Sequence, residues 1–516
     1  MRAKPGRLWW HAEEMSNPGD FGAHVEQVLR TDGWQAAAAI IEQNWDRHVF
    51  TEPQKLLTAI RALPGEAFID RPTFLVAANY LQHVAHGTDP GRFNHEGWLD
   101  ANMTGHEIGL INTLALLTSR SAGARTTGDM VDARRSAEEA RHALRRSSKQ
   151  ERAAIRSSIP HFRLQWGRSL ELADAPEADR EYEEAYELAM LTDQPLIARR
   201  AASHRAWVSA ERGRMRDAEL WLARARSGAA SNGRYDVVIY LTEALVRLDR
   251  GDTVGAEREL ARARGLGSGE YWGAKMWVQS MLASDAASAA IADARLSHEI
   301  SRWPGVLQAP TANGRYTRAA RARLGAIRRH STKHLVPPVI ASGTDRVISA
   351  AVAHADGRFE RALDIARPTT TATDEPPRTK TAALIVYAAA AHRLGQNETA
   401  ATAFIQAYAV IEHERLFTAY EVVPYDDVTA LASLTGVPLR EVRTAVPSPR
   451  TEKFALTRRE HEVLALMAQG RTTADIAELL FISRNTLKST VRRLYKKLDA
   501  TSRPAALDTA RRNDLL

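Results

Sequence analysis

The sequence predicts an all-α protein, in which a long array of helical hairpins precedes a small helical domain. Over most of the 516 residues, apolar side chains recur at intervals of three and four positions, and Ala, Leu, Arg and Glu dominate. Patterns typical of strands are scarce. Near the carboxyl end, short helical patterns begin at Ser or Thr residues, which are favoured helix caps. Both parts of the chain therefore belong to the all-α class.

Length and composition narrow the class of protein further. At about 100–200 residues per domain the chain would hold three or four domains, unless a repeat array accounts for its length. The 44% of hydrophobic and 26% of charged residues are typical of an ordered globular protein. No stretch approaches the roughly 18 apolar residues of a membrane helix, and no apolar signal segment opens the chain. Cysteine is absent. We expect a cytoplasmic protein without a membrane segment, disulfides or a thiolate zinc site.

The predicted array contains a recurring glycine and alanine pattern. A Gly is followed by Ala five residues later and by a second Ala seven residues further on, as in Gly128/Ala133/Ala140, Gly213/Ala218/Ala225, Gly251/Ala256/Ala263 and Gly395/Ala400/Ala407. Gly permits a tight turn between two helices, and Ala lets the second helix lie close to the first. Gly213 and Gly251 are 38 residues apart, as are Gly357 and Gly395. Helix-pair repeats have periods of about 34 to 47 residues. The pattern resembles tetratricopeptide repeats, and an irregular helical bundle is the alternative.

The composition divides the chain into four parts. We expect a weakly ordered N-terminus over residues 1–20, a helical repeat sensor or interaction domain over 21–445, a linker over 446–455 and a separate domain over 456–516. Within the array, Pro368 to Pro377 has the composition of a loop.

All 11 tryptophans lie in the first 450 residues. Trp45, Trp166, Trp207 and Trp221 are expected to fill gaps between helices, and a ligand groove lined by some of them is the alternative.

The run from Gly33 to Phe74 is similar to the start of the helical region in large MalT-like regulators. In that family an ATP-binding module precedes the helices. This chain contains no Gly-Lys dipeptide, so it lacks a phosphate-binding loop of the GxxxxGK[ST] type. The resemblance implies a protein that keeps the sensor and the reader of the family without the ATP-binding module. We expect no cofactor and no metal site.

The C-terminal residues carry most of the excess charge and three helix caps. From Thr451 onward there are 13 basic and 8 acidic residues, a net charge of +5 out of +8 for the whole chain. An anionic partner is therefore expected at this end. Thr457 with Glu460 forms a capping box, Thr472 with Asp475 offers a second, and Ser483 a third N-cap. Two short helices joined by a tight turn are the helix-turn-helix pattern.

The third of these helices, predicted from Arg484 to Leu498, is strongly amphipathic. Its inward face comprises Leu487, Val491, Leu494 and Leu498. Its opposite face carries Asn485, Lys488, Ser489, Arg492, Arg493 and Lys496. Six basic residues and no acidic one lie between Ser483 and Leu498. Such a face suits the major groove of double-stranded DNA, whose walls are phosphate and whose floor offers hydrogen-bond acceptors. The alternative is a solvated basic face with no partner.

The stretches LTRREHEVLALMAQG, TTADIAELLFIS and NTLKSTVRRLYKKL resemble a LuxR-type helix-turn-helix domain over Leu456 to Arg512. The resemblance implies four helices, with the third in the major groove and the last at a dimer interface. It implies base-facing positions for Lys488, Ser489 and Arg492, and positions near phosphate for Thr486 and Arg493. Thr490 departs from the family, which often has His there, and this puts one backbone contact in doubt.

These observations predict a transcription regulator that binds double-stranded DNA as a dimer, with repeats that sense a small-molecule or protein effector. No HExxH, GxSxG or dinucleotide fingerprint is present, so we do not expect an enzyme. One alternative is a protein-interaction scaffold with secondary DNA binding, because repeat arrays expose concave binding surfaces. Another is a regulator similar to a sigma factor, although the repeats do not resemble a promoter-melting domain.

Overall fold

The computed structural model describes residues 21–71, 74, 77–78, 81, 109–227, 236–264, 269–328, 342–439, 456–498 and 500–512. These residues are helical or lie in turns and loops, and none of them forms a strand, which confirms the all-α prediction. The chain divides into two compact units, one of residues 1–353 and 359–447 and one of residues 448–516 with 354–358. The expected N-terminal tail and the expected linker over 446–455 lie outside the described residues. Among the described helices, none combines the length and apolarity needed to cross a membrane.

The first unit begins with a small helical subcluster. Its helices are α1 (Phe21–Thr31), α2 (Trp34–Thr51), α3 (Pro53–Arg61) and α4 (Gly65–Asp70). Val25, Ile41, Leu56 and Ile60 are fully buried between them. Helices α2, α3 and α4 lie within the run from Gly33 to Phe74 that resembles the MalT-like helical region.

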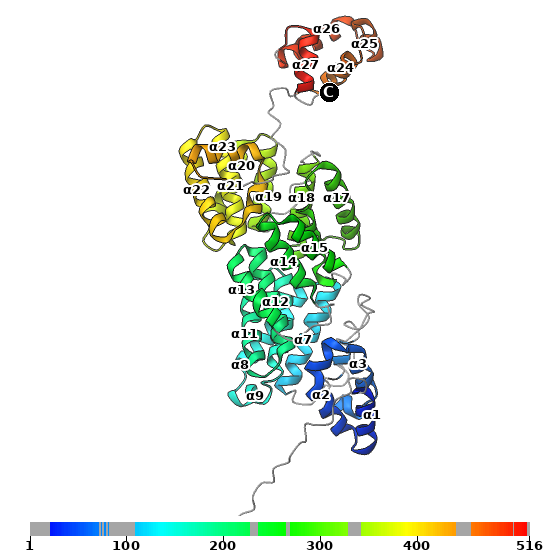
Figure 1. Cartoon of the computed structure of the whole chain (residues 1–516). Helices are drawn as coiled ribbons and strands as arrows, with labels where there is room; N and C mark the ends of the chain where they lie inside the picture. The colour runs from blue at the N-terminus through cyan, green and yellow to red at the C-terminus, as the bar shows by residue number, and fades with distance from the viewer. Residues whose placement is uncertain are drawn as a thin grey trace, which may run out of the picture. The chain divides into compact units, whose positions relative to one another are not determined.

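Helical hairpins follow, stacked one after another (Figure 1). They comprise α7 (Leu110–Thr127), α8 (Met130–Arg146), α9 (Lys149–Ala154), α10 (Ile159–Leu172), α11 (Ala178–Leu191), α12 (Pro195–Arg212), α13 (Met215–Ser227), α14 (Val237–Asp249) and α15 (Thr253–Arg264). Gly128, Gly213 and Gly251 adopt φ of 86°, 86° and 80° at the turns, a conformation that glycine tolerates. Both alanines after each of these glycines are fully buried. The glycine and alanine pattern thus marks close helix contacts, while the kinship with tetratricopeptide repeats stays a prediction.

The remaining elements of the first unit are η1 (Gly269–Tyr271), α16 (Trp272–Ser280), α17 (Ala286–Ser301), α18 (Ala312–Ile327), α19 (Gly343–Ala355), α20 (Phe359–Thr371), α21 (Pro377–Arg393), α22 (Asn397–Glu414), η3 (Phe417–Val422) and α23 (Tyr425–Thr435). The prediction of a loop from Pro368 to Pro377 is wrong at its start, because Pro368 lies inside α20. Packing holds this last turn: Thr369 is buried, and Nε of Arg346 donates to its hydroxyl at 2.9 Å.

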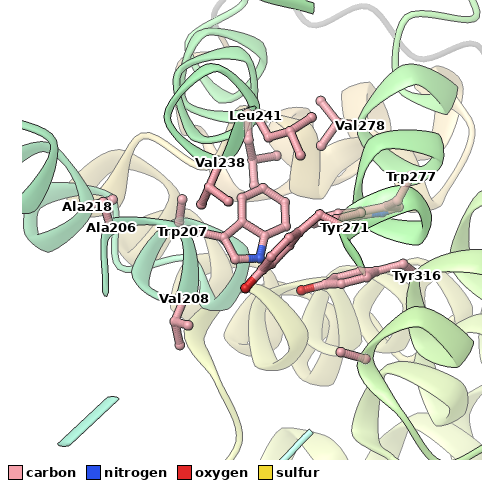
Figure 2. Packing of buried hydrophobic residues seen from close by; sticks show 14 of the residues in the cluster. Ala206, Trp207, Val208, Ala218, Val238, Leu241, Tyr271, Trp277, Val278 and Tyr316 are labelled. Atoms are coloured by element: carbon pink, nitrogen blue, oxygen red, sulfur yellow. The ribbon is translucent and has the colours of Figure 1, made fainter. Parts of the chain in front are cut away.

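The core of the first unit is rich in aromatic side chains. Figure 2 shows Trp207 of α12 beside Trp277 and Tyr316. The ring centroid of Trp207 lies 6.4 Å from that of Trp277 and 5.9 Å from that of Tyr316. Trp166, Trp207 and Trp221 are buried and fill gaps between helices. The side chain of Trp45 lies outside the described residues.

A polar cluster is buried next to these rings. The Glu171 carboxylate accepts hydrogen bonds from the hydroxyls of Tyr182 and Tyr271, and Nδ1 of His204 lies 3.6 Å from it. Burial raises the pKa of Glu171 to about 7, although the two tyrosines and Arg168 act in the opposite direction. Burial lowers the pKa of His204 well below its usual value, with the charges of Arg168 and Arg200 adding to the effect. At low pH an uncharged Glu171 is therefore the form that the fold favours.

Later elements of the first unit pack against α12 and α14, with α21 contacting α12 and η3 contacting α14. Both helices have buried residues on all of their faces. Arg378, at the start of α21, donates to the backbone oxygens of Ala210 at 2.8 Å and Glu211 at 3.1 Å. Its guanidinium also lies 2.6 Å from the fully buried carboxylate of Asp249. The end of α12 and the end of α14 are thus joined to a helix more than a hundred positions further along the chain.

Candidate nucleic-acid interface

The second unit contains four helices, α24 (Arg458–Ala468), α25 (Thr473–Leu479), α26 (Arg484–Lys497) and α27 (Arg503–Arg512) (Figure 1). All three predicted N-caps are present. Thr457 with Glu460 and Thr472 with Asp475 form capping boxes, and the Ser483 hydroxyl accepts from the amide of Thr486 at 3.1 Å. These local hydrogen bonds fix where α24, α25 and α26 begin.

The four helices enclose a small apolar core. Its fully buried members are Val463, Leu464, Leu487, Leu494, Leu498, Ala506 and Ala510. Val491, the remaining predicted inward residue of α26, is partly buried against this core. The inward face of α26 therefore packs on α24 and α25, as the apolar spacing predicts.

The turn between α25 and α26 is tight and held by backbone hydrogen bonds. The amide of Ile482 donates to the oxygen of Ala477 at 2.9 Å, and Phe481 adopts φ of 53°. The guanidinium of Arg459 in α24 donates to the oxygen of Leu480. That of Arg503 in α27 donates to the oxygen of Met467 at 2.6 Å. These two arginines position α25 and α27 against α24, and no local pattern in the sequence indicates this.

The outward face of α26 presents all the predicted site residues to solvent. The exposed residues are Asn485, Thr486, Lys488, Ser489, Arg492, Arg493 and Lys496. The described residues offer Lys488, Arg492 and Lys496 no carboxylate partner. The hydroxyl of Ser489 donates to the oxygen of Thr486 at 2.8 Å, so it can still accept a hydrogen bond from another group. The face is therefore cationic and free to meet an anionic surface.

Two residues of α26 lie away from this face. Nζ of Lys497 lies 2.7 Å from the Glu460 carboxylate, which is almost fully buried. Burial alone would raise the pKa of Glu460, but hydrogen bonds from Lys497 and Thr457 outweigh it and lower the pKa below its usual value. Thr490 is buried, and its hydroxyl donates to the oxygen of Thr486 at 2.9 Å. The position at which the sequence departs from the LuxR pattern is thus turned away from the exposed face.

Residues 455–510 match the family described as bacterial regulatory proteins of the luxR family. The C-terminal domain belongs to this luxR family. The chain is 45% identical over 60 residues to the transcription regulator BvgA of Bordetella pertussis, which is 12% of this chain and 29% of that protein. It is 42% identical over 62 residues to the transcriptional regulatory protein LiaR of Bacillus subtilis, again 12% and 29% of the two chains. It is 32% identical over 100 residues to the oxygen regulatory protein NreC of Staphylococcus epidermidis, or 19% and 46%.

The similarity covers only part of each protein. The chain spans about three tenths of the length of BvgA and LiaR. No solved structure matches the chain significantly. The comparisons therefore confirm the resemblance of the C-terminal stretch to LuxR-type domains.

Proposed function

We propose that the protein is a DNA-binding transcription regulator whose helix α26 enters the major groove of double-stranded DNA. The observation that carries this proposal is the division of α26 into two faces. Leu487 and Leu494 are buried in the luxR-family core, whereas Lys488, Arg492 and Lys496 are exposed and have no ion-pair partner among the described residues. A cationic helix supported from behind by a packed domain is the arrangement by which helix-turn-helix proteins read DNA.

The exposed side chains supply the chemistry for both kinds of contact. Lys488 and Arg492 can donate to the O6 and N7 acceptors of guanine, and Ser489 can bond to several base edges. Thr486 and Arg493, nearer the walls of the groove, are suited to phosphate. Asn485 and Lys496 lie on the same exposed face at either end. We assign the base contacts to the first three residues and positioning on the backbone to the others.

We further propose that the luxR-family domain binds DNA as a dimer, on two half-sites related by two-fold symmetry. A single small domain makes few contacts, and paired half-sites multiply its affinity. Footprints should therefore show two protected half-sites related by two-fold symmetry. Protection of isolated half-sites would contradict the dimer. A regulator of this kind binds the chromosome. We therefore propose that the protein acts in the cytoplasm.

The helical array is proposed to sense a small-molecule or protein effector. The chain's own elements cover α12 and α14, since α21 packs against α12 and η3 against α14. These two helices therefore offer little exposed surface to a partner, and a protein partner would use other helices of the array. Binding of an effector to the array and of DNA to the C-terminal domain would allow one chain to couple a signal to transcription.

The salt dependence of DNA binding tests the proposal. With about 4 to 6 phosphate contacts per domain, the logarithm of the affinity should fall by about 0.9 per contact for each tenfold increase in salt. Fluorescence anisotropy of the full chain with labelled duplex DNA measures this slope. Association that does not weaken with salt would contradict binding through the cationic face of α26.

A further inference from the structure

A second cationic surface lies in the first unit, where α8 ends and α9 begins. Arg145 and Arg146 occupy the last turn of α8, Lys149 opens α9, and Arg156 follows it. All four side chains are exposed, and none forms an ion pair with another residue of the described part of the chain. We call these four residues the basic corner.

The basic corner differs from the rest of the described array. Arginines there are commonly matched with carboxylates, as in the pairs Arg141–Glu181 at 2.6 Å and Arg134–Glu138 at 2.7 Å. Exposed arginines without an ion pair occur singly, as at Arg258, Arg295 and Arg361. Four such cations within 12 positions are therefore not a general property of this arginine-rich chain.

The helix dipoles stabilise only two of the four cations in the basic corner. Arg145 and Arg146 lie in the last turn of α8, where cations interact favourably with the helix dipole. Lys149 lies in the first turn of α9, where a cation is unfavourable, and Arg156 lies beyond the end of α9. An external anion is the interaction that would stabilise all four charges together.

The backbone beneath the basic corner is well fixed. Ser148 and Glu151 form a capping box at the start of α9, so the only carboxylate in this segment is occupied by the cap. The guanidinium of Arg152 donates to the oxygen of Ser147, and Nε2 of Gln194 donates to that of Ser157 at 2.6 Å. Buried Ile155 anchors the segment in the core. The four cations therefore project from a preorganised turn.

We propose that the basic corner binds the sugar-phosphate backbone of duplex DNA outside the site read by the luxR-family domain. This inference rests on the proposed function, because it assumes that the luxR-family domain binds DNA. Three of the four residues are arginines, whose planar guanidinium matches phosphate oxygens in pairs. Aromatic side chains for stacking bases are absent from the four, which favours duplex backbone over single strands.

A small anion is a poorer occupant. The hollow beside the basic corner is lined by the cations Arg135, Arg141, Arg145 and Arg146, by His142 and Ala143, but also by the carboxylates of Glu138 and Glu139. An ion enclosed there would face two carboxylates. An extended polyanion can contact the exposed cations along the turn without entering the hollow, and release of its counterions favours binding.

The test uses the full chain and a long random-sequence duplex, with affinity measured by anisotropy over a series of salt concentrations. The variant R145Q/R146Q/K149Q/R156Q removes the four charges. The matched control R30Q/R258Q/R295Q/R361Q removes four exposed charges that lie apart from one another. We expect the salt slope of the corner variant to fall by about 3 to 4 and that of the control to stay unchanged. Thermal melting verifies that both variants are folded.

The outcomes separate this inference from the proposed function. An unchanged slope in the corner variant, or an equal fall in the control, would overturn the role of the basic corner. If K488A/R492A also binds DNA as well as the unmodified protein does, both the basic-corner inference and the proposed function fail. Polyglutamate serves as a second probe: loss of its binding in the corner variant, with an unchanged duplex slope, would assign the surface to an acidic protein segment and overturn the DNA proposal.

Discussion

Nζ of Lys497 in α26 lies 2.7 Å from Oε2 of Glu460, the residue that closes the capping box of α24. The neighbouring Lys496 points to solvent on the cationic face. Two adjacent lysines of one helix therefore have different tasks. Lys497 fixes α26 against the start of α24, and Lys496 remains available to an anionic partner.

Replacing Glu460 should weaken the C-terminal domain in a way that depends on pH. The pKa of Glu460 is lowered from 4.5 in the folded protein, so its stabilising contribution is complete above about pH 4.5 and is lost as the pH falls toward the lowered pKa. Glu460→Gln should cost about 1–3 kcal/mol at neutral pH and flatten this acid dependence. Urea unfolding at several pH values measures both effects. The exposed Glu478→Gln serves as the control, and an equal loss there would contradict the assignment.

Substitutions on the exposed face of α26 should separate base contacts from phosphate contacts. Lys488→Ala and Arg492→Ala should each cost about 1–3 kcal/mol on the preferred site and relax selection at one position. Arg493→Ala should instead weaken binding to all sequences and lower the salt slope by about 0.9. Selection from a random duplex pool, with Arg258→Ala as control, measures the profiles. Profiles unchanged by Lys488→Ala and Arg492→Ala would refute the base contacts.

Glu171 should give the first unit a contribution to stability that falls as the pH rises toward neutrality, while the lowered pKa of His204 acts in the opposite direction over the same range. The pKa of Glu171 is raised from 4.5 to about 7 by burial, so the uncharged form stabilises the fold below about pH 4.5, and this contribution is lost between about pH 4.5 and 7. The difference amounts to roughly 3 kcal/mol. Glu171→Gln should remove this part of the pH dependence while keeping a polar partner for Tyr182 and Tyr271. Melting temperatures across this range test it, with the exposed Glu183→Gln expected to behave as the unmodified protein.

Two turn glycines should respond differently to the same substitution. Gly213 and Gly251 have φ of 86° and 80°, so alanine is strained at both by about 1–2 kcal/mol. A Cβ at Gly213 would also lie 2.6 Å from the backbone nitrogen of Arg378, whereas nothing lies within 4 Å at Gly251. Gly213→Ala should therefore be more destabilising than Gly251→Ala by a further ~1–3 kcal/mol. Equal melting temperatures would show that α21 does not press on the end of α12.

Local rules predicted the features that depend on a few neighbouring residues. The caps at Thr457, Thr472 and Ser483 and the glycine turns form within four or five positions, so the residue types alone indicate them. The exposure of the cationic face followed from helical spacing. DNA contacts by these residues stay a prediction.

The features that sequence reasoning missed join distant positions. Lys497 and Glu460 are 37 positions apart, and Arg378 and Asp249 are 129 apart. Nothing in the local pattern around a lysine or arginine shows which buried carboxylate it will meet. The helical end of α20 at Pro368 was missed for the same reason, because tertiary packing on Thr369 outweighs the preference of proline for a loop.

Arg378 also affects how the helical array unfolds. An array whose units touch only their neighbours can fray from its ends or be cut into independently stable pieces. Here one guanidinium bonds to the carbonyls that end α12 and to the carboxylate that ends α14. Replacing Arg378 by Gln would leave the buried charge of Asp249 without its cation, at a cost of about 3–5 kcal/mol. The helices from α12 to α21 should consequently melt in a single cooperative transition.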